Sequence, residues 1–382
     1  MKNFSSLLER FLESKKNNAK QYFDVDEIVS LIDYFLDKDD VPNLKAVVEL
    51  GYDELHSDDV NFKISLCKAL IAIEDFGSAM KMIDNIGGLR NKNIDLMRIE
   101  CYCELGRVEE TFKLIDELTV GNSPYLEDAI VRAVCKMNDM DDMNHNETYN
   151  LIKHALTMFP GSLTLKSELC YNLELQGKTK EALTLCRELI DEDPYSAEIW
   201  YMQGRLYSLC ADFERSVDSL DFALTCINGN EDPELEYEIK LTKAYCLYKN
   251  ESYSKAITVY EELTSCDEFV DSDVNIFLAE CYMNMEEYEK AYQILKRMVG
   301  HKDLEDEISF YGNLIYCCIE TERRKEAVDI LGYTLKLFPG NIFEYLSKLN
   351  MTQEQLMDSC NEENYTVGDL ARRYLNCNLH NN

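Results

Sequence analysis

The chain has 382 residues, of which 46% are hydrophobic, but only 15 are Gly and 6 are Pro. So few turn-forming residues argue against an all-β fold, and the length requires either several domains or one elongated array of repeats. The formal net charge of -33, from 72 acidic and 39 basic residues, disfavours nucleic acid as a direct partner, because this charge repels phosphate groups.

The N-terminal segment, residues 1–24, is predicted to form a capping helix. Its apolar stripe at helical spacing consists of Phe4, Leu7, Leu8, Phe11 and Leu12. Charged residues interrupt this segment, which does not have the hydrophobic run of a signal peptide. No stretch of the sequence reaches the roughly 18 apolar residues that cross a bilayer. We therefore expect a cytoplasmic protein without a membrane association, in which the 15 cysteines stay reduced.

From residue 25 onward, the sequence repeats a pair of amphipathic helices. Asp24 and Glu27 have the spacing of a capping box, which predicts the start of the first opening helix. Pro160 and Pro194 each close a helical pattern and lie 34 residues apart. Opening helices are expected to start near residues 25, 60, 92, 129, 163, 197, 237, 272 and 308. This gives about nine helix hairpins over residues 25–341, followed by C-terminal capping helices over residues 342–382.

The hairpin that starts near residue 197 carries the clearest signature. Its opening helix has Trp200, Gln203, Gly204 and Tyr207, and its closing helix has Ser216, Leu220 and Ala223. Later hairpins align through Ala244, Tyr253, Ala256 and Tyr260, through Ala279, Tyr282, Tyr288, Ala291 and Leu295, and through Ala327 and Leu331. This pattern resembles the tetratricopeptide repeat, whose signature is W-x2-L-G-x2-Y, then A-x3-F, then P, with a period of 34.

The resemblance covers about residues 25–341 and is closest to long, acidic bacterial members of the family with a DPYS-x3-W segment. It implies an all-α fold, a right-handed α-α superhelix of about nine helix hairpins with terminal capping helices. The physical basis is that small residues such as Gly204 and Ala244 let two helices cross closely. Because no hairpin buries its apolar face alone, each one depends on its neighbour.

In the family that this sequence resembles, the opening helices line a concave surface on which partners bind as peptides. The residues predicted to line it here are Tyr171, Tyr201, Arg205, Tyr245, Tyr248, Phe277, Asn313 and Tyr316. Aromatic and Arg side chains dominate binding hot spots. The alternative is that these residues only pack against neighbouring helices, since a chain with 24 tyrosines places some on every surface. Inner acidic residues, among them Glu198, Asp273 and Glu280, favour a neutral or basic partner.

Motifs for catalysis or metal binding do not emerge. The cysteines form no C-x2-C pair, and Cys67, Cys170 and Cys186 fall where the repeat requires a small or apolar core residue. The five histidines are scattered, and no phosphate-binding loop occurs. We therefore predict no enzymatic activity, no cofactor and no metal.

Two functional hypotheses follow from these observations. The first is a non-catalytic scaffold or adaptor that binds a peptide or a helical segment of a partner protein. The alternative is a regulatory protein that senses a ligand or peptide, or a non-catalytic subunit of an enzyme complex.

Overall fold

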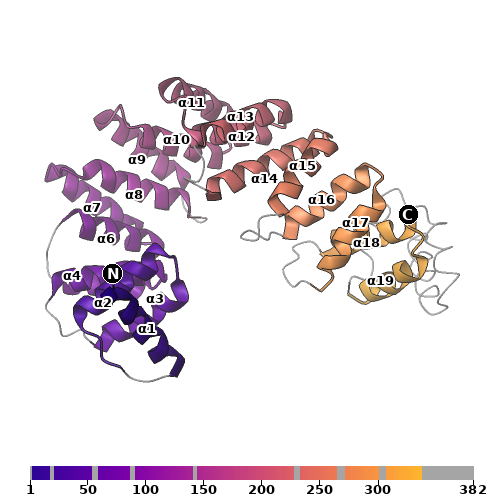
Figure 1. Cartoon of the computed structure of the whole chain (residues 1–382). Coiled ribbons are helices and arrows are strands. Elements are labelled where there is room, and N and C mark those ends of the chain that lie inside the picture. The colour runs from indigo at the N-terminus through magenta and orange to yellow at the C-terminus, as the bar shows by residue number, and fades with distance from the viewer. Residues whose placement is uncertain are drawn as a thin grey trace. The chain divides into compact units, whose positions relative to one another are not determined.

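The structure is a computed structural model that describes residues 2–17, 21–53, 59–86, 91–140, 144–227, 233–264, 272–300 and 307–337. These residues form 19 α-helices and the turns between them, and none of them belongs to a β-strand. The predicted all-α repeat of helix hairpins is confirmed (Figure 1). The predicted C-terminal capping helices, residues 342–382, lie outside the described residues. The chain divides into two compact units, residues 1–185 and 186–382.

Unit 1 begins with the single helix α1, and helix hairpins follow it. Its helices are α1 (Lys2–Asn17), α2 (Val25–Asp37), α3 (Val41–Asp53), α4 (Val60–Ala72), α5 (Phe76–Asn85), α6 (Lys92–Glu104), α7 (Val108–Val120), α8 (Leu126–Asn138), α9 (His145–Met158), α10 (Leu163–Leu175) and the first part of α11 (Thr179–Glu192). The opening helices α2, α4, α6, α8 and α10 pack in series, each against the next. Leu7 and Phe11 of α1 are buried in the same core as α2 to α5.

Unit 2 continues the same alternation. Its helices after α11 are α12 (Ala197–Leu209), α13 (Phe213–Cys226), α14 (Pro233–Lys249), α15 (Tyr253–Thr264), α16 (Ser272–Asn284), α17 (Tyr288–Met298), α18 (Glu307–Glu320) and α19 (Arg324–Leu337). The opening helices α12, α14, α16 and α18 again pack each against the next. The closing helices α13, α15 and α17 each pack against the opening helices on both sides, as α15 does with α14 and α16.

The helix ends follow local sequence signals. The predicted capping box at the start of α2 is present: the Glu27 amide donates to the Asp24 side chain, and the Asp24 amide donates to the Glu27 side chain. Helix α14 begins at Pro233, four residues before the expected start at 237. Proline suits the first position of a helix because its ring presets φ and the amide it lacks would have no helical partner.

The turns inside the hairpins share one backbone conformation. Eight residues there have positive φ, and each lies 14 positions after an expected hairpin start, from Asp39 against 25 to Glu322 against 308. They are Asp39, Glu74, Gly106, Gly177, Ala211, Glu251, Glu286 and Glu322. The amide that follows each one bonds back five residues, as Asp212 N does to Tyr207 O at 3.0 Å. This left-handed helix cap ends the opening helix and aims the closing helix back along it.

Small residues lie where paired helices cross, and their side chains join the two backbones. The Ser216 hydroxyl of α13 donates to the Gly204 carbonyl of α12 at 2.7 Å, and the Cys170 thiol of α10 donates to the Ala182 carbonyl of α11 at 3.3 Å. Cys67, Cys170 and Cys186 are all buried, as predicted. Burial raises the pKa of Cys67 to about 12, so its thiol stays protonated at neutral pH.

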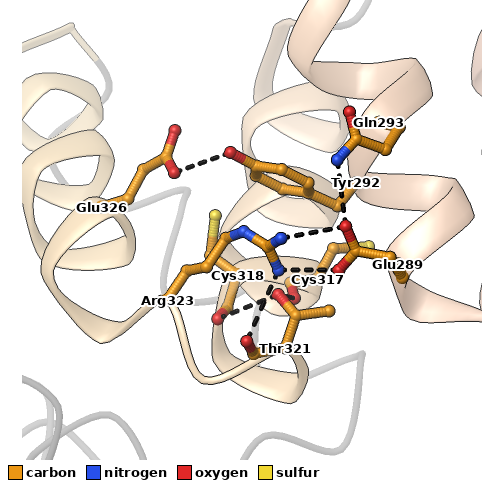
Figure 2. Close-up of polar contacts among 8 residues, drawn as sticks. All are labelled: Glu289, Tyr292, Gln293, Cys317, Cys318, Thr321, Arg323 and Glu326. Atoms are coloured by element: carbon orange, nitrogen blue, oxygen red, sulfur yellow. Dashed lines mark hydrogen bonds and ion pairs between the residues drawn. The ribbon is translucent and has the colours of Figure 1, made fainter.

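Polar contacts join one hairpin to the next, as Figure 2 shows for α17, α18 and α19. Arg323 donates two hydrogen bonds to the Glu289 carboxylate, at 2.8 and 2.9 Å, and its guanidinium lies 4.1 Å from the centre of the Tyr292 ring. The Tyr292 hydroxyl in turn donates to Glu326 at 2.8 Å. Hydrogen bonds from Gln293 and Arg323 hold the pKa of Glu289 below its usual range. Arg323 and Glu289 are 34 residues apart, which is one repeat length.

Candidate protein-interaction surfaces

Seven of the eight predicted binding residues lie on the opening helices of unit 2. Tyr201 and Arg205 belong to α12, Tyr245 and Tyr248 to α14, Phe277 to α16, and Asn313 and Tyr316 to α18. The eighth residue, Tyr171, belongs to α10 in unit 1 and is separate from this set.

Three of the aromatic residues form one cluster between α14 and α16. The Phe277 ring centre lies 5.9 Å from that of Tyr245 and 5.6 Å from that of Tyr248. The buried ring of Tyr260 stacks on Phe277 from the other side, at 6.2 Å. Tyr245 remains 36% exposed and is therefore the member of this cluster that is open to a partner.

A carboxylate on α16, that of Glu280, already binds two of the predicted residues, Tyr248 and Asn313. The Tyr248 hydroxyl donates to Glu280 at 2.9 Å, and the buried Asn313 amide donates to the same carboxylate at 3.1 Å. Burial, and then the charge of Glu280, raises the pKa of Tyr248 above its usual range. These contacts join α14, α16 and α18, so Tyr248 and Asn313 hold the helices together in addition to any role in binding.

Tyr201 and Tyr316 make similar contacts at either side of this cluster. The Tyr201 hydroxyl lies 3.4 Å from both Glu238 and Thr242 of α14. The Arg205 guanidinium lies 5.7 Å from the centre of the Tyr201 ring, within the range of a cation–π interaction. Tyr316 packs edge-on against Tyr288 with ring centres 5.7 Å apart. The sequence placed these residues on the opening helices correctly, but the spacing did not reveal their contacts with neighbouring helices.

Unit 1 has a groove on the face of its opening helices, with a volume of about 510 Å³. We call it the α8 groove, because α8 forms its floor between α6 and α10. Its lining residues are Leu96, Pro124, Glu127, Asp128, Val131, Arg132, Cys135, Lys136, Asp139 and Thr164. Leu96, Pro124 and Val131 supply apolar surface, and most of the remaining lining residues are charged.

Ion pairs between α6 and α8 hold the basic side chains of the groove. Lys136 lies 2.7 Å from Glu104 and 3.5 Å from Glu100, and Arg132 lies 3.6 Å from Glu100. Burial lowers the pKa of Lys136, but the hydrogen bond to Glu104 and the nearby carboxylates outweigh this effect and raise it overall. The two cations of the groove are thus already neutralised by the chain itself.

Two acidic side chains of the groove are not neutralised in this way. Glu127, in the first turn of α8, and Asp139, at the C-terminal cap of α8, form no ion pair with any other described residue. Burial, offset in part by Lys136, raises the pKa of Asp139. Since a helix rises 1.5 Å per residue, the backbone positions of these two residues lie about 18 Å apart along the groove.

The repeat signature does not reveal the α8 groove, because none of the residues that line the groove matches the signature. The spacing of charged residues in the sequence nevertheless indicates a shared surface on α6 and α8. Glu100 and Glu104 have helical i,i+4 spacing, and Arg132 and Lys136 have the same spacing 32 residues later, close to one repeat length. This arrangement predicts a charged face shared by two consecutive opening helices.

Metal-ligating groups and the Cys135 thiol are the remaining side chains to consider in the described part of the chain. It contains no group of three or more His, Cys, Asp or Glu side chains placed to hold a metal ion. Burial raises the pKa of Cys135, at the groove, to about 12, and its thiol donates to Glu168 at 3.1 Å. A protonated thiol is a poor nucleophile, so Cys135 is not activated for covalent chemistry at neutral pH.

Comparison with known proteins shows which proteins the repeats of this chain resemble. Residues 250–334 match the family described as anaphase-promoting complex, cyclosome, subunit 3. A TPR repeat-containing protein of Bacillus subtilis, YpiA, is 26% identical over 48% of this chain and 41% of its own length. The human protein O-mannosyl-transferase TMTC1 is 24% identical over 37% of this chain and 15% of its own length. The chain thus spans less than half the length of either relative.

Solved structures also resemble the chain. The structure of YrrB, titled as a TPR protein with an unusual peptide-binding site, has 16% sequence identity and a TM-score of 0.44. The match covers 52% of this chain and 98% of YrrB. Within the described residues, no helix is both long enough and apolar enough to span a membrane.

Proposed function

Because the chain is a tetratricopeptide-repeat protein, we propose that it is a non-catalytic scaffold that binds a peptide or helical segment of a partner protein on its opening helices. Repeat proteins of this kind generally serve protein–protein interaction through extended surfaces. A reducing, cytoplasmic compartment fits this role, since the buried cysteines are free thiols.

The α8 groove is the observation that carries this proposal. It lies on the opening helices, and its volume of about 510 Å³ accommodates several side chains of a partner. Its cations are already paired, whereas Glu127 and Asp139 are available. The groove therefore favours a partner segment with basic side chains over an acidic one.

The spacing of the two carboxylates limits the partner further. An extended chain advances about 3.3 Å per residue, so a span of about 18 Å corresponds to five or six residues. We expect the partner segment to carry two Lys or Arg residues at about this separation, with small or apolar residues between them to cover Leu96 and Val131.

The proposed binding surface also includes aromatic residues on the opening helices of unit 2. The exposed face of Tyr245 on α14, together with Tyr201 and Arg205 on the preceding opening helix, supplies aromatic surface for a neutral segment. The hydroxyl of Tyr201 contacts α14, so its removal weakens the helix contact as well as the surface. Variants of Tyr245 therefore test binding more cleanly than variants of Tyr201.

The α8 groove is tested by the double variant Glu127→Gln/Asp139→Asn. The full chain is immobilised, and the proteins that it captures from a lysate are quantified by mass spectrometry at low and physiological salt. We expect at least one partner to lose about fivefold to thirtyfold in affinity, because the variant removes two partly exposed charge pairs that contribute about 0.5–1 kcal/mol each. The native complex is expected to weaken with salt more than the complex of the variant.

The matched control is Glu109→Gln/Asp116→Asn, which removes the same charge from the exposed face of the closing helix α7. It should leave the captured proteins unchanged. Identical capture by the groove variant and the control would rule out the α8 groove. Tyr245→Ala is run alongside them, and partner loss in that variant alone would place the binding surface in unit 2.

A further inference from the structure

The hairpin formed by α12 and α13 carries an exposed pair of aromatic rings. Trp200 of α12 stacks on Phe222 of α13 with ring centres 4.8 Å apart and an angle of 25° between the ring planes. Phe222 is 55% exposed, and Tyr195, in the turn before α12, is 83% exposed. The indole nitrogen of Trp200 donates to the Pro194 carbonyl at 2.9 Å, which holds the ring beside this turn. We call Tyr195, Trp200 and Phe222 the aromatic patch.

The repeat does not require aromatic side chains at the positions of Trp200 and Phe222. In the next hairpin, α14 and α15, the equivalent residues are Lys240 and Glu262, whose charged groups lie 3.8 Å apart. An ion pair at these positions is thus compatible with the same arrangement of helices. Trp200 also packs against the buried core of α13 and α14, but Phe222 presents more than half of its surface to solvent. Contiguous exposed apolar surface is a feature of interaction sites.

Two carboxylates lie at the edge of the aromatic patch. Asp193 precedes Pro194 in the turn, and Glu198 is in the first turn of α12. The Cys226 thiol lies 3.9 Å from the Pro194 carbonyl, and its pKa is raised by burial and then by the charges of Asp193 and Glu198. Both carboxylates are therefore close to the carbonyl that the indole of Trp200 contacts. Neither of them forms an ion pair with another described residue.

We propose that the aromatic patch binds an arginine side chain in a basic segment of a partner protein. The planar guanidinium group of arginine stacks on aromatic faces, and the electron-rich face of the ring attracts its charge. The open face of Phe222 supplies this contact, and Asp193 and Glu198 accept hydrogen bonds from the guanidinium or from a neighbouring basic residue. A neutral or acidic segment would leave both carboxylates without a cation, so the charges favour a basic one.

The aromatic patch is independent of the surfaces in the proposed function. It belongs to unit 2 and shares no residue with the α8 groove or with Tyr201, Arg205 and Tyr245. A partner that binds only the opening helices leaves the aromatic patch uncovered, and the reverse also holds. The two proposals therefore stand or fall separately.

Trp200 is the only tryptophan of the chain, so its fluorescence reports on this surface directly. The probe is a ten-residue peptide with two arginines and no aromatic residue, which is added to the full chain at low salt. We expect a saturable change in the emission of Trp200 and a weaker affinity at higher salt. The same peptide with citrulline in place of arginine keeps the shape of the side chain without its charge. It should bind about fivefold more weakly or worse.

Variants are compared by the anisotropy of a fluorescein-labelled form of the arginine peptide. Phe222→Ala is expected to lower the affinity about fivefold, and Phe222→Tyr to retain it. The matched control is Tyr333→Ala. Tyr333 packs edge-on against Tyr311 at the equivalent positions of α18 and α19 and is 51% exposed, so the control removes a similar ring elsewhere. It should leave the affinity unchanged.

A double variant tests whether binding requires the aromatic pair or only this arrangement of helices. Trp200→Lys/Phe222→Glu copies the Lys240 and Glu262 pair of the next hairpin, so it introduces side chains that the repeat already accommodates. Circular dichroism should show that it folds, and the arginine peptide should no longer bind.

A second double variant, Asp193→Asn/Glu198→Gln, removes the two charges but keeps their acceptor oxygens. It should lower the affinity about threefold to tenfold. The variant Glu127→Gln/Asp139→Asn of the α8 groove should leave the response of Trp200 to the peptide unchanged, which separates this surface from that of the proposed function.

Four results would overturn the proposal. The first is no effect of the arginine peptide on the emission of Trp200. The second is equally tight binding of the citrulline peptide, which would show that the surface selects shape and not charge. The third is an equal loss of affinity in Phe222→Ala and Tyr333→Ala. The fourth is a native dimer in sedimentation that dissociates in Phe222→Ala, which would assign the aromatic patch to a second copy of the chain.

Discussion

Replacing Gly204 with alanine is expected to lower the free energy of unfolding of unit 2 by about 1–2 kcal/mol, although alanine is the better helix former. A Cβ atom at this position would lie 2.7 Å from both Cγ and Cδ2 of Leu220, and 3.4 Å from the Ser216 carbonyl oxygen. Leu220 is fully buried, so it has to shift within the core to make room for the added Cβ. Overpacking of a core costs about 1–3 kcal/mol, which exceeds the helix-propensity gain of about 0.5–1 kcal/mol.

Urea denaturation followed by tryptophan fluorescence measures this effect directly, because Trp200 is the only tryptophan and belongs to the same helix. Gly77→Ala in α5 is the matched control, since the nearest contact of a Cβ there would be Oδ1 of the N-cap residue Asp75, at 3.9 Å. Circular dichroism should show that it leaves the chain as stable as before or more stable. A Gly204→Ala chain as stable as the native one would show that α12 and α13 do not cross so closely.

Tyr260→Ala is expected to destabilise unit 2 by about 3–5 kcal/mol, as other aromatic truncations in cores do. Tyr260 is fully buried, stacks on Phe277, and belongs to the largest core cluster of unit 2. Its hydroxyl is also buried and has no hydrogen-bond partner among the described residues. An unsatisfied buried polar group costs about 1–3 kcal/mol, so Tyr260→Phe should be at least as stable as the native chain.

The dependence of stability on pH distinguishes the contribution of the Tyr260 ring from that of its hydroxyl. Burial raises the pKa of Tyr260 above its ordinary value of about 10. Above this pH the unfolded tyrosine loses its proton while the native one keeps it, so the native chain loses stability as the pH rises. The Tyr260→Phe variant does not have this loss, and its advantage in urea denaturation should grow between pH 9 and 11. A variant less stable than the native chain at every pH would mean that the hydroxyl has a hydrogen-bond partner.

Much of the fold was predictable because the repeat imposes the same physical requirement many times. A crossing point needs a small residue, and Gly204, Ala244 and Cys170 were recognisable as such from their spacing. The buried cysteines were predictable for the same reason, since a thiol fits where the signature requires a small apolar side chain.

The turns inside the hairpins were less predictable from local sequence. Only Gly106 and Gly177 of the eight residues with positive φ are glycines, and four of the others are glutamates. Glutamate in this conformation costs about 1 kcal/mol or more, so its own preference does not favour the turn. The packing of the two helices imposes it, and the 14-residue spacing from the hairpin start is the only sequence signal.

The candidate binding residues show the limit of a signature-based prediction. The pattern placed Tyr248 and Asn313 on the opening helices, but only the structure shows that both bind Glu280. The α8 groove is formed by residues that depart from the signature or lie between its positions. The identity of such residues depends on what the surface contacts. The repeat pattern reflects the packing between helices and contains no information about those contacts.

Hydrogen–deuterium exchange of the full chain, with and without a partner recovered by capture, is the most direct measurement of the scaffold proposal. We predict slower exchange in peptides from the opening helices α6, α8 and α10 when the partner is bound, and little change in the closing helix α7. Protection restricted to closing helices, or no protection in any helix at saturating partner, would contradict the assignment of the opening-helix face as the binding surface.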